Sequence, residues 1–223
     1  MSVFAFLSNQ AASQQQITNP GFENWHHLTD GILMPVNWNS VKNSDASEFI
    51  LRMVPDVVFQ SSDAHSGEYC VKLQNEELFG NVVNGVLTNG CIHAVSNKSE
   101  CYIYTNPDVS TYNTPFTSRP DSLAGWYEYS PQDGDKPFVK VLLHKGKASV
   151  PAFETKANWI GIAEVLFPSE KVSEWKRFSV PFTYFTNENP EYILVIISSG
   201  DGLNAKKGSV GYFDGLKLIY NNH

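Results

Sequence analysis

The sequence is short of charge, and most of the charge that it carries is negative. Only 17 % of the 223 residues are Asp, Glu, Lys or Arg, against about 25 % in an average soluble domain. Sixteen Lys and Arg stand against 23 Asp and Glu, which gives a formal charge of −7 at pH 7. A nucleic-acid partner is therefore not expected, because neutralising phosphates requires a basic face.

Long hydrophobic runs are lacking too. The longest, residues 3–7 and 192–197, fall well short of the roughly 20 apolar residues that a membrane-spanning helix needs. No transmembrane span is expected. Residues 1–16 contain the apolar run 3–7 followed by Ala11-Ala12-Ser13, without a basic start. They are interpreted as a signal-peptide remnant or an ordinary N-terminal extension, and residues 17–223 as a single domain.

Cysteine is scarce. The chain has three, Cys70, Cys91 and Cys101, so at least one has no partner within the chain. Cys91 and Cys101 bracket a turn-like stretch, and the alternatives are a disulfide across a hairpin or free cysteines that behave as small apolar side chains. No Cys-x-x-Cys pattern occurs, which excludes a zinc ribbon or a thioredoxin-type site.

Aromatic and turn-forming residues are abundant instead. The sequence has 14 Phe, 10 Tyr and 5 Trp, together with 19 Asn and 22 Ser. Asn and Ser favour turns over helices. Short apolar or alternating runs recur along the chain, and nearly every one ends at Gly, Pro, Asn or Asp. This pattern predicts an all-β protein, an antiparallel β-sandwich.

The predicted strands are residues 49–53, 57–59, 69–73, 81–87, 101–104, 123–129, 138–144, 159–167, 175–182, 192–198 and 210–220. The dipeptides Asn89-Gly90 and Asp133-Gly134 stand between strands, where their tolerance of positive φ suits hairpin turns. The only helix-like start is at residues 168–175.

The two ends of the predicted domain carry a first resemblance. Asn19-Pro20-Gly21-Phe22-Glu23-Asn24-Trp25 opens it, and the segment 210–218 with Asp214 closes it. This pairing resembles galactose-binding-like and carbohydrate-binding jelly rolls. The resemblance implies that Glu23 and Asp214 hold one structural Ca²⁺ together with main-chain carbonyls, since Ca²⁺ takes six to eight oxygen ligands. The alternative is that both carboxylates cap turns or pair with a lysine.

Interior motifs carry a second resemblance. Pro35-Val36-Asn37-Trp38, then Ser66-Gly67-Glu68-Tyr69, then the stretch from Arg119-Pro120-Asp121 to Trp126-Tyr127-Glu128-Tyr129 occur in that order. They resemble a carbohydrate metabolism domain family of secreted and surface proteins of Bacteroidetes, over residues 17–220. The resemblance implies a jelly-roll sandwich, a location outside the cytoplasm and a role in glycan handling, with no established reaction.

Three aromatic residues at predicted strand ends or turns are candidates for sugar binding. Pyranose rings stack their CH faces on aromatic rings while polar side chains bind the hydroxyls. Trp25, Trp159 and Tyr184 are the candidate platforms, and Arg119 and Asp121 the polar partners. The alternative is that these rings fill the core, as most aromatics of a sandwich do.

No catalytic motif emerges. Glycoside hydrolysis needs two carboxylates about 5–10 Å apart, and the pairs Glu128 with Asp135 and Glu154 with Glu164 have no motif support. A nucleophile elbow and a metal motif are also missing. The sequence thus predicts a secreted or surface carbohydrate-binding module without catalytic residues, whose partner is an oligo- or polysaccharide. The alternatives are a polysaccharide-active enzyme that uses a carboxylate pair, and a structural or adhesive surface module.

Overall fold

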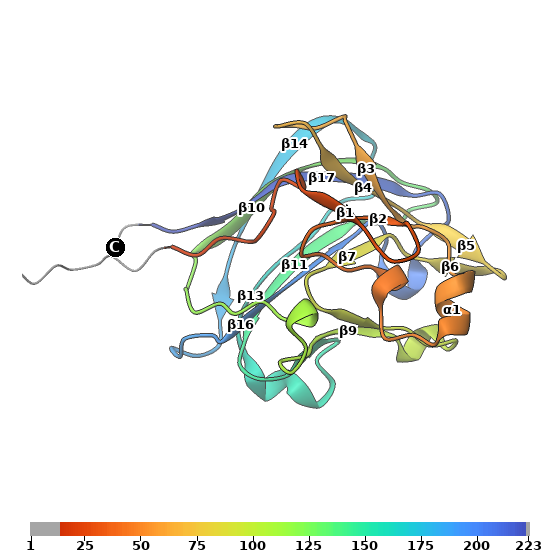
Figure 1. Cartoon of the computed structure of the whole chain (residues 1–223). Coiled ribbons are helices and arrows are strands. Elements are labelled where there is room, and N and C mark those ends of the chain that lie inside the picture. The colour runs from red at the N-terminus through yellow and green to blue at the C-terminus, as the bar shows by residue number, and fades with distance from the viewer. Residues whose placement is uncertain (1–13, 222–223) are drawn as a thin grey trace, which may run out of the picture.

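Two five-stranded antiparallel sheets face each other in the computed structural model, which describes residues 14–221. In sheet 1 the strand order is β14-β10-β17-β4-β3, and in sheet 2 it is β15-β13-β11-β16-β7. Figure 1 shows sheet 1 above sheet 2. The arrangement confirms the predicted all-β sandwich of jelly-roll type.

The strands of sheet 1 are β3 (Val58–Ser61), β4 (Cys70–Gln74), β10 (Ser122–Ser130), β14 (Val172–Pro181) and β17 (Val210–Ile219). Those of sheet 2 are β7 (Val86–Thr88), β11 (Phe138–His144), β13 (Trp159–Leu166), β15 (Thr183–Tyr184) and β16 (Tyr192–Ser198). The smaller sheets contain β1 (Trp25–His27) with β2 (Leu33–Pro35), β5 (Glu76–Leu78) with β6 (Asn81–Val83), and β8 (Cys91–His93) with β9 (Tyr102–Thr105) and β12 (Ala148–Val150).

The main core fills the space between the two sheets. Along β10, Leu123, Tyr127 and Tyr129 are buried in it, while Trp126 and Glu128 remain half-buried on the opposite face. This alternation is what a strand with one buried face requires. Asp133-Gly134 follows β10 with φ of 43° and 83°, so the predicted turn chemistry is confirmed there. It is wrong at Asn89-Gly90, where neither residue has a positive φ and the flanking strands β7 and β8 belong to different sheets.

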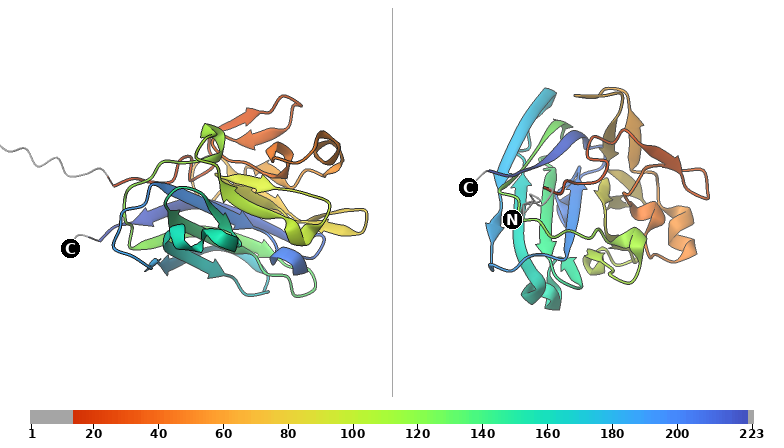
Figure 2. Two further views of the ribbon diagram at one scale, coloured as in Figure 1. Left: turned by 90° about the horizontal axis from the view of Figure 1, so that it is seen from below. Right: turned by 60° about the vertical axis from the view of Figure 1, so that its left-hand side comes forward.

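A third layer covers the outer face of sheet 2. The sheet β12-β9-β8 lies against it, and a second, smaller apolar cluster fills the contact: Leu142, Ala148, Trp159, Leu194 and Ile196. The left view of Figure 2 looks from this side, with the yellow-green strands of the third layer in front of sheet 2. Strands β11 and β16 are thus buried on both faces.

Three further local predictions are wrong. Residues 49–53 form the helix α1 (Glu48–Met53), because the Ser47 side chain caps it by accepting from the Ile50 N–H. Residues 168–175 contain no helix, and β14 already begins at Val172. The stretch 81–87 divides into β6 and β7, since the chain at Gly85 approaches β4 and Ser199 so closely that a Cβ would lie 2.4 Å from the Ser199 Oγ.

The structure also decides between the alternatives for cysteine. Cys70, Cys91 and Cys101 are all free, the first two of them buried. In the described part of the chain, 3-10 helices are formed by Val41–Asn43, Lys98–Glu100, Ser110–Tyr112, Phe153–Asn158 and Gly202–Asn204. Within residues 14–221, no helix has the length and hydropathy to cross a bilayer.

The two ends of the described chain lie side by side. The Gln16 side chain donates to the Leu218 carbonyl at 2.8 Å and accepts from its N–H at 2.9 Å, and the Tyr220 hydroxyl donates to the Gln15 carbonyl. Gln15 and Gln16, which come just before the predicted start of the domain at residue 17, are thus hydrogen-bonded to β17 and the residue after it. Most of the predicted extension lies outside the described residues.

Candidate ligand-binding face

The outer face of sheet 1 carries a row of aromatic and acidic side chains. Trp126 and Glu128 point outward from β10, because their neighbours Tyr127 and Tyr129 point into the core. Glu128 lies opposite Tyr212 of β17 in the strand register, and Trp126 lies opposite Asp214. We refer to this surface as the β10 face.

Two further rings complete an aromatic group on the β10 face. His65, in the loop between β3 and β4, stacks on Trp126 with ring centroids 3.7 Å apart and an interplanar angle of 16°. Trp175 of β14 meets His65 edge-on at 6.0 Å. His65 is exposed and both indoles are half-buried. The group therefore presents ring surface to solvent, although His65 covers one side of Trp126.

Carboxylates surround the aromatic group. Burial raises the pKa of Glu128, and the nearby charges of Asp63 and Glu174 raise it further. Burial also raises the pKa of Tyr212, with a further contribution from Asp63. Rings beside carboxylates and a phenol hydroxyl can stack on the CH face of a sugar and accept hydrogen bonds from its hydroxyls.

The carboxylate pairs considered from the sequence are placed elsewhere. Asp135 is only 2 % exposed and accepts from the Asn75 side chain and the backbone N–H groups of Asp201 and Lys206. Glu164 forms an ion pair with Lys140 at 2.8 Å, and Glu154 lies in the 3-10 helix Phe153–Asn158. The carboxylates whose charges act on Glu128 are those of Asp63 and Glu174, and Asp135 is not among them.

Arg119, Asp121 and Tyr184 are brought together at another place, around β15. The Arg119 guanidinium lies 4.0 Å from the centre of the Tyr184 ring and donates to the carbonyls of Thr186 and Glu188. The Tyr184 hydroxyl donates to the Pro120 carbonyl at 2.7 Å, and the Asp121 carboxylate accepts from the Asn221 N–H. These contacts fasten the loop after β15, and a sugar-binding role for the three residues remains a prediction.

Trp159 and Trp25 are separate from that group. Trp159 begins β13, is 8 % exposed and lies under the Lys156 ammonium, whose nitrogen is 3.7 Å from the centre of the indole ring. Trp25 begins β1, packs half-buried against the main core, and donates from its indole N–H to the Phe22 carbonyl. Both indoles pack within the fold, and their role as platforms stays a prediction.

Glu23 and Asp214 both reach the loop that carries His65. The Glu23 carboxylate accepts from the N–H groups of Glu68 at 3.0 Å and Tyr69 at 3.3 Å. Asp214 accepts from the Ser66 N–H at 2.8 Å through Oδ2. Its other oxygen, Oδ1, is buried without a hydrogen-bond partner in the described part of the chain.

The charge around these two carboxylates suits a cation. Burial raises the pKa of Asp214, and the negative charge of Glu23 raises it further. None of the ion pairs between described residues includes either carboxylate. A buried carboxylate oxygen without a donor is costly, and a bound Ca²⁺ would relieve that cost. Glu23 and Asp214 are therefore compatible with the predicted ion and would supply its carboxylate ligands, although the described residues contain no group of three or more His, Cys, Asp or Glu side chains that could hold a metal by themselves.

Sequence reasoning noticed only part of the β10 face. The alternation of Trp126 and Glu128 along one strand is visible in the sequence. His65, Asp63 and Trp175 come from other segments, and a single sequence does not indicate which strand each of them faces. The only sequence signal near His65 is the motif Ser66-Gly67-Glu68-Tyr69, which directly follows it.

No family model and no curated protein matches the chain. Solved structures of similar outline include TmCBM61 in complex with β-1,4-galactotriose (14 % identity, TM-score 0.41, covering 92 % of this chain and 97 % of that one). CBM28, a carbohydrate-binding module specific for non-crystalline cellulose, has 9 % identity and a TM-score of 0.47 over 92 % of this chain and 94 % of its own. The K3 adhesin domain of Lys-gingipain from Porphyromonas gingivalis W83 has 13 % identity and a TM-score of 0.44 over 93 % and 100 %. Likenesses of this size leave the ligand of this chain open.

Proposed function

We propose that the chain is a non-catalytic carbohydrate-binding module, which binds an oligo- or polysaccharide on the β10 face. The observation that carries the proposal is the group of Trp126, His65 and Trp175 beside the Glu128 carboxylate. The same ligand class is named for TmCBM61 and CBM28, but the support lies in the surface itself.

The charge of the face favours a neutral glycan. Glu128, Asp63 and Glu174 lie close enough for their charges to interact, and the chain as a whole carries −7. A polysaccharide of uronic acids would add further negative charge at this place, and like charges repel. Hydroxyl groups, by contrast, can donate to the carboxylates.

Binding is tested by affinity electrophoresis and calorimetry on neutral polysaccharides with acidic ones for comparison. Trp126→Ala and Trp175→Ala are expected to weaken retention at least tenfold, because each removes ring surface from the face. Trp25→Ala is the matched control, since its half-buried indole lies on β1. Loss of retention in the control alone, or retention unchanged in both face variants, would refute the placement.

The bound Ca²⁺ is part of the proposal. We infer that Glu23 and Asp214 hold one ion, whose charge would compensate the two carboxylates and fix the loop with Ser66 and Gly67. Since that loop also carries His65, the ion would steady the ring that covers Trp126. Calcium should then raise the melting temperature and alter Trp fluorescence, and neither effect should occur in Asp214→Asn.

A second candidate function is polysaccharide cleavage. The observation in its favour is that Glu128 lies near Asp63 and Glu174 and that burial, together with their charges, raises its pKa, because glycosidases use two neighbouring carboxyl groups, one of them with a raised pKa. Release of reducing sugar from the polysaccharides that bind, abolished by Glu128→Gln, would establish it. Binding without release in the wild type supports the module.

The location outside the cytoplasm is likewise a proposal. It rests on the apolar run at residues 3–7 followed by small residues, which suit a cleaved signal. Mass spectrometry of the protein recovered from culture medium would test it, with an N-terminus near residue 14 expected. Recovery only from the cytoplasm would contradict it.

A further inference from the structure

The side of the molecule away from the β10 face contains a cavity of about 520 Å³. Phe138 of β11 and Ile196 of β16 form part of its lining from the outer face of sheet 2. The other walls come from α1, the β5–β6 hairpin and the third layer with β8 and β9, which lie together in Figure 1 at the end opposite the C-terminus. Ligand cavities of proteins measure about 300–1,000 Å³, so this one is large enough for a small molecule.

The cavity is apolar, and its rim exposes large hydrophobic side chains. Four of the eight exposed large hydrophobic residues in the described chain line it: Phe49, Met53, Phe79 and Leu203. Phe49 and Phe79 are 73 % and 75 % exposed. Contiguous apolar surface of this kind marks an interaction site more often than scattered exposed residues do.

One cation stands in this apolar lining. Lys98 is the only charged residue among the described residues that line the cavity. Its ammonium group donates to the Leu203 carbonyl at 3.4 Å, and no ion pair between described residues includes it. Burial lowers the pKa of Lys98. An ammonium group has three donors, so Lys98 can still bind an anion.

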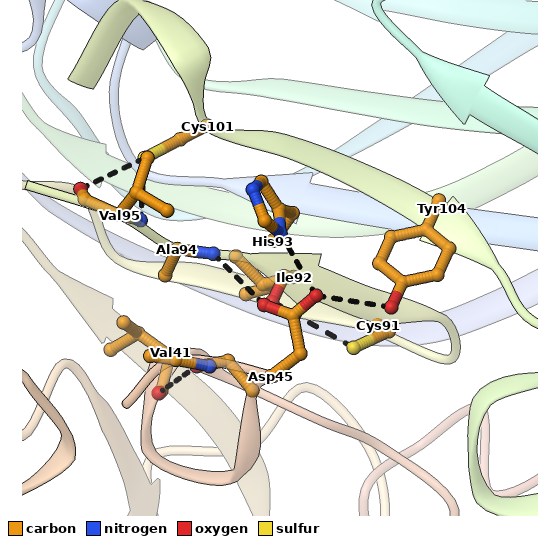
Figure 3. Close-up of polar contacts among 11 residues, drawn as sticks. Val41, Asp45, Cys91, Ile92, His93, Ala94, Val95, Cys101 and Tyr104 are labelled. Carbon is orange, nitrogen blue, oxygen red and sulfur yellow. Dashed lines mark hydrogen bonds and ion pairs between the residues drawn. The ribbon is translucent and has the colours of Figure 1, made fainter. Parts of the chain in front are cut away.

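The wall that contains α1 is fixed in place. The Asp45 carboxylate, just before α1, accepts from the Ala94 N–H at 3.3 Å and the Tyr104 hydroxyl at 3.1 Å, and lies 2.9 Å from His93 Nδ1 (Figure 3). The backbone N–H of Asp45 donates to the Ile92 carbonyl. These bonds tie the segment before α1 to β8 and β9, so α1 and the third layer form one connected wall of the cavity.

We propose that this cavity binds a long-chain carboxylate, with the alkyl chain between α1 and sheet 2 and the carboxylate at Lys98. The apolar lining fits an unbranched chain, and the single cation fits a single anionic head group. The charge of Asp135 acts on Lys98, but the Asp135 carboxylate forms its hydrogen bonds with other groups. An uncharged lipid would therefore leave the ammonium without an ion-pair partner, and a sugar would leave the apolar walls unfilled. The proposal does not depend on sugar binding, because the β10 face lies on the other side of the sandwich.

The probe is a series of saturated fatty acids from decanoate to hexadecanoate, measured by calorimetry below their critical micelle concentrations. Affinity should rise about fourfold for each added methylene until the cavity is filled.

Lys98→Gln should weaken hexadecanoate binding about tenfold and leave the affinity for hexadecanol unchanged. Retained hexadecanol binding shows that the variant is folded. Lys171→Gln, an exposed lysine of the segment that leads into β14, is the matched control.

Two outcomes would overturn the proposal. The first is an absence of binding across the series, or equal binding of hexadecanoate by wild type and Lys98→Gln. The second is a dimer in analytical ultracentrifugation that Phe49→Ser converts to a monomer, since a second copy of the chain would then cover the cavity. Trp126→Ala should leave fatty-acid affinity unchanged, so failure of the sugar proposal and failure of this one are distinguishable.

Discussion

Protonation of His144 is expected to destabilise the fold as the pH falls. His144 ends β11, is fully buried, and its Nε2 lies 2.9 Å from the Thr105 hydroxyl of β9. Its Nδ1 is buried without a partner within residues 14–221. Burial lowers the pKa of His144 from 6.5 to about 4. The neutral ring therefore belongs to the contact between sheet 2 and the third layer.

The sign follows from proton linkage. In the unfolded chain His144 takes up a proton near pH 6.5, whereas in the folded protein it stays neutral down to about pH 4. The free energy of unfolding therefore falls as the pH drops through this window, and is independent of His144 above it. Two and a half pKa units correspond to about 3 kcal/mol at the acid limit, and to about 2 kcal/mol at pH 5 relative to pH 8.

Urea denaturation at pH 8 and pH 5 measures this effect. The wild type should lose about 2 kcal/mol more than His144→Gln between the two pH values, because glutamine does not titrate. His27→Gln, an exposed histidine of β1, is the control and should behave as the wild type. The raised pKa values of Glu128 and Asp214 increase the free energy of unfolding as the pH falls, which is the opposite direction. This contribution is the same in wild type and His144→Gln, so it cancels when the two are compared. Equal losses in wild type and His144→Gln would refute the reasoning.

Three further outcomes are expected. Gly67→Ala should cost about 1–3 kcal/mol of stability and abolish the calcium response in calorimetry, because Gly67 has a φ of 76° and a Cβ would lie 1.9 Å from the Glu23 Oε1. Arg119→Ala should cost about 1–2 kcal/mol in urea denaturation while sugar retention is unchanged, since its donors hold the loop after β15; lost retention with unchanged stability would instead favour a sugar site at Arg119. Ser47→Ala should cost about 1 kcal/mol and weaken hexadecanoate binding, because the cap holds α1 at the cavity; unchanged binding would separate the cap from the site.

The sandwich was predictable from the sequence because most strands end at turn residues that act locally. The strand 138–144 and the strand 192–198 agree with β11 and β16 to the residue. Helix α1 was not predictable, because the run Phe49-Ile50-Leu51 has the composition of a strand and six residues are too few for a helical period to stand out. Its cap, Ser47, is one of 22 serines.

The sites depend on contacts between distant segments, which a single sequence does not specify. The β10 face needs His65 to lie on Trp126, across 61 positions of the chain (126 − 65). The proposed calcium ligands Glu23 and Asp214 were predicted only through a resemblance, because they lie at opposite ends of the domain sequence and the closing strand brings them together. The cavity was missed, since its walls come from elements with no common motif.

Because β11 and β16 are buried on both faces, the molecule has two apolar clusters of unequal size, one on each side of sheet 2. The main core between the sheets contains many more side chains than the cluster of Leu142, Leu194 and Ile196 beneath the third layer. Regions with fewer buried apolar contacts unfold locally at a lower free-energy cost. We therefore expect β8, β9 and β12 to detach from sheet 2 while the sandwich stays folded. Amide hydrogens of β9 should then exchange earlier than those of β10. The cavity wall and the β10 face would accordingly differ in mobility.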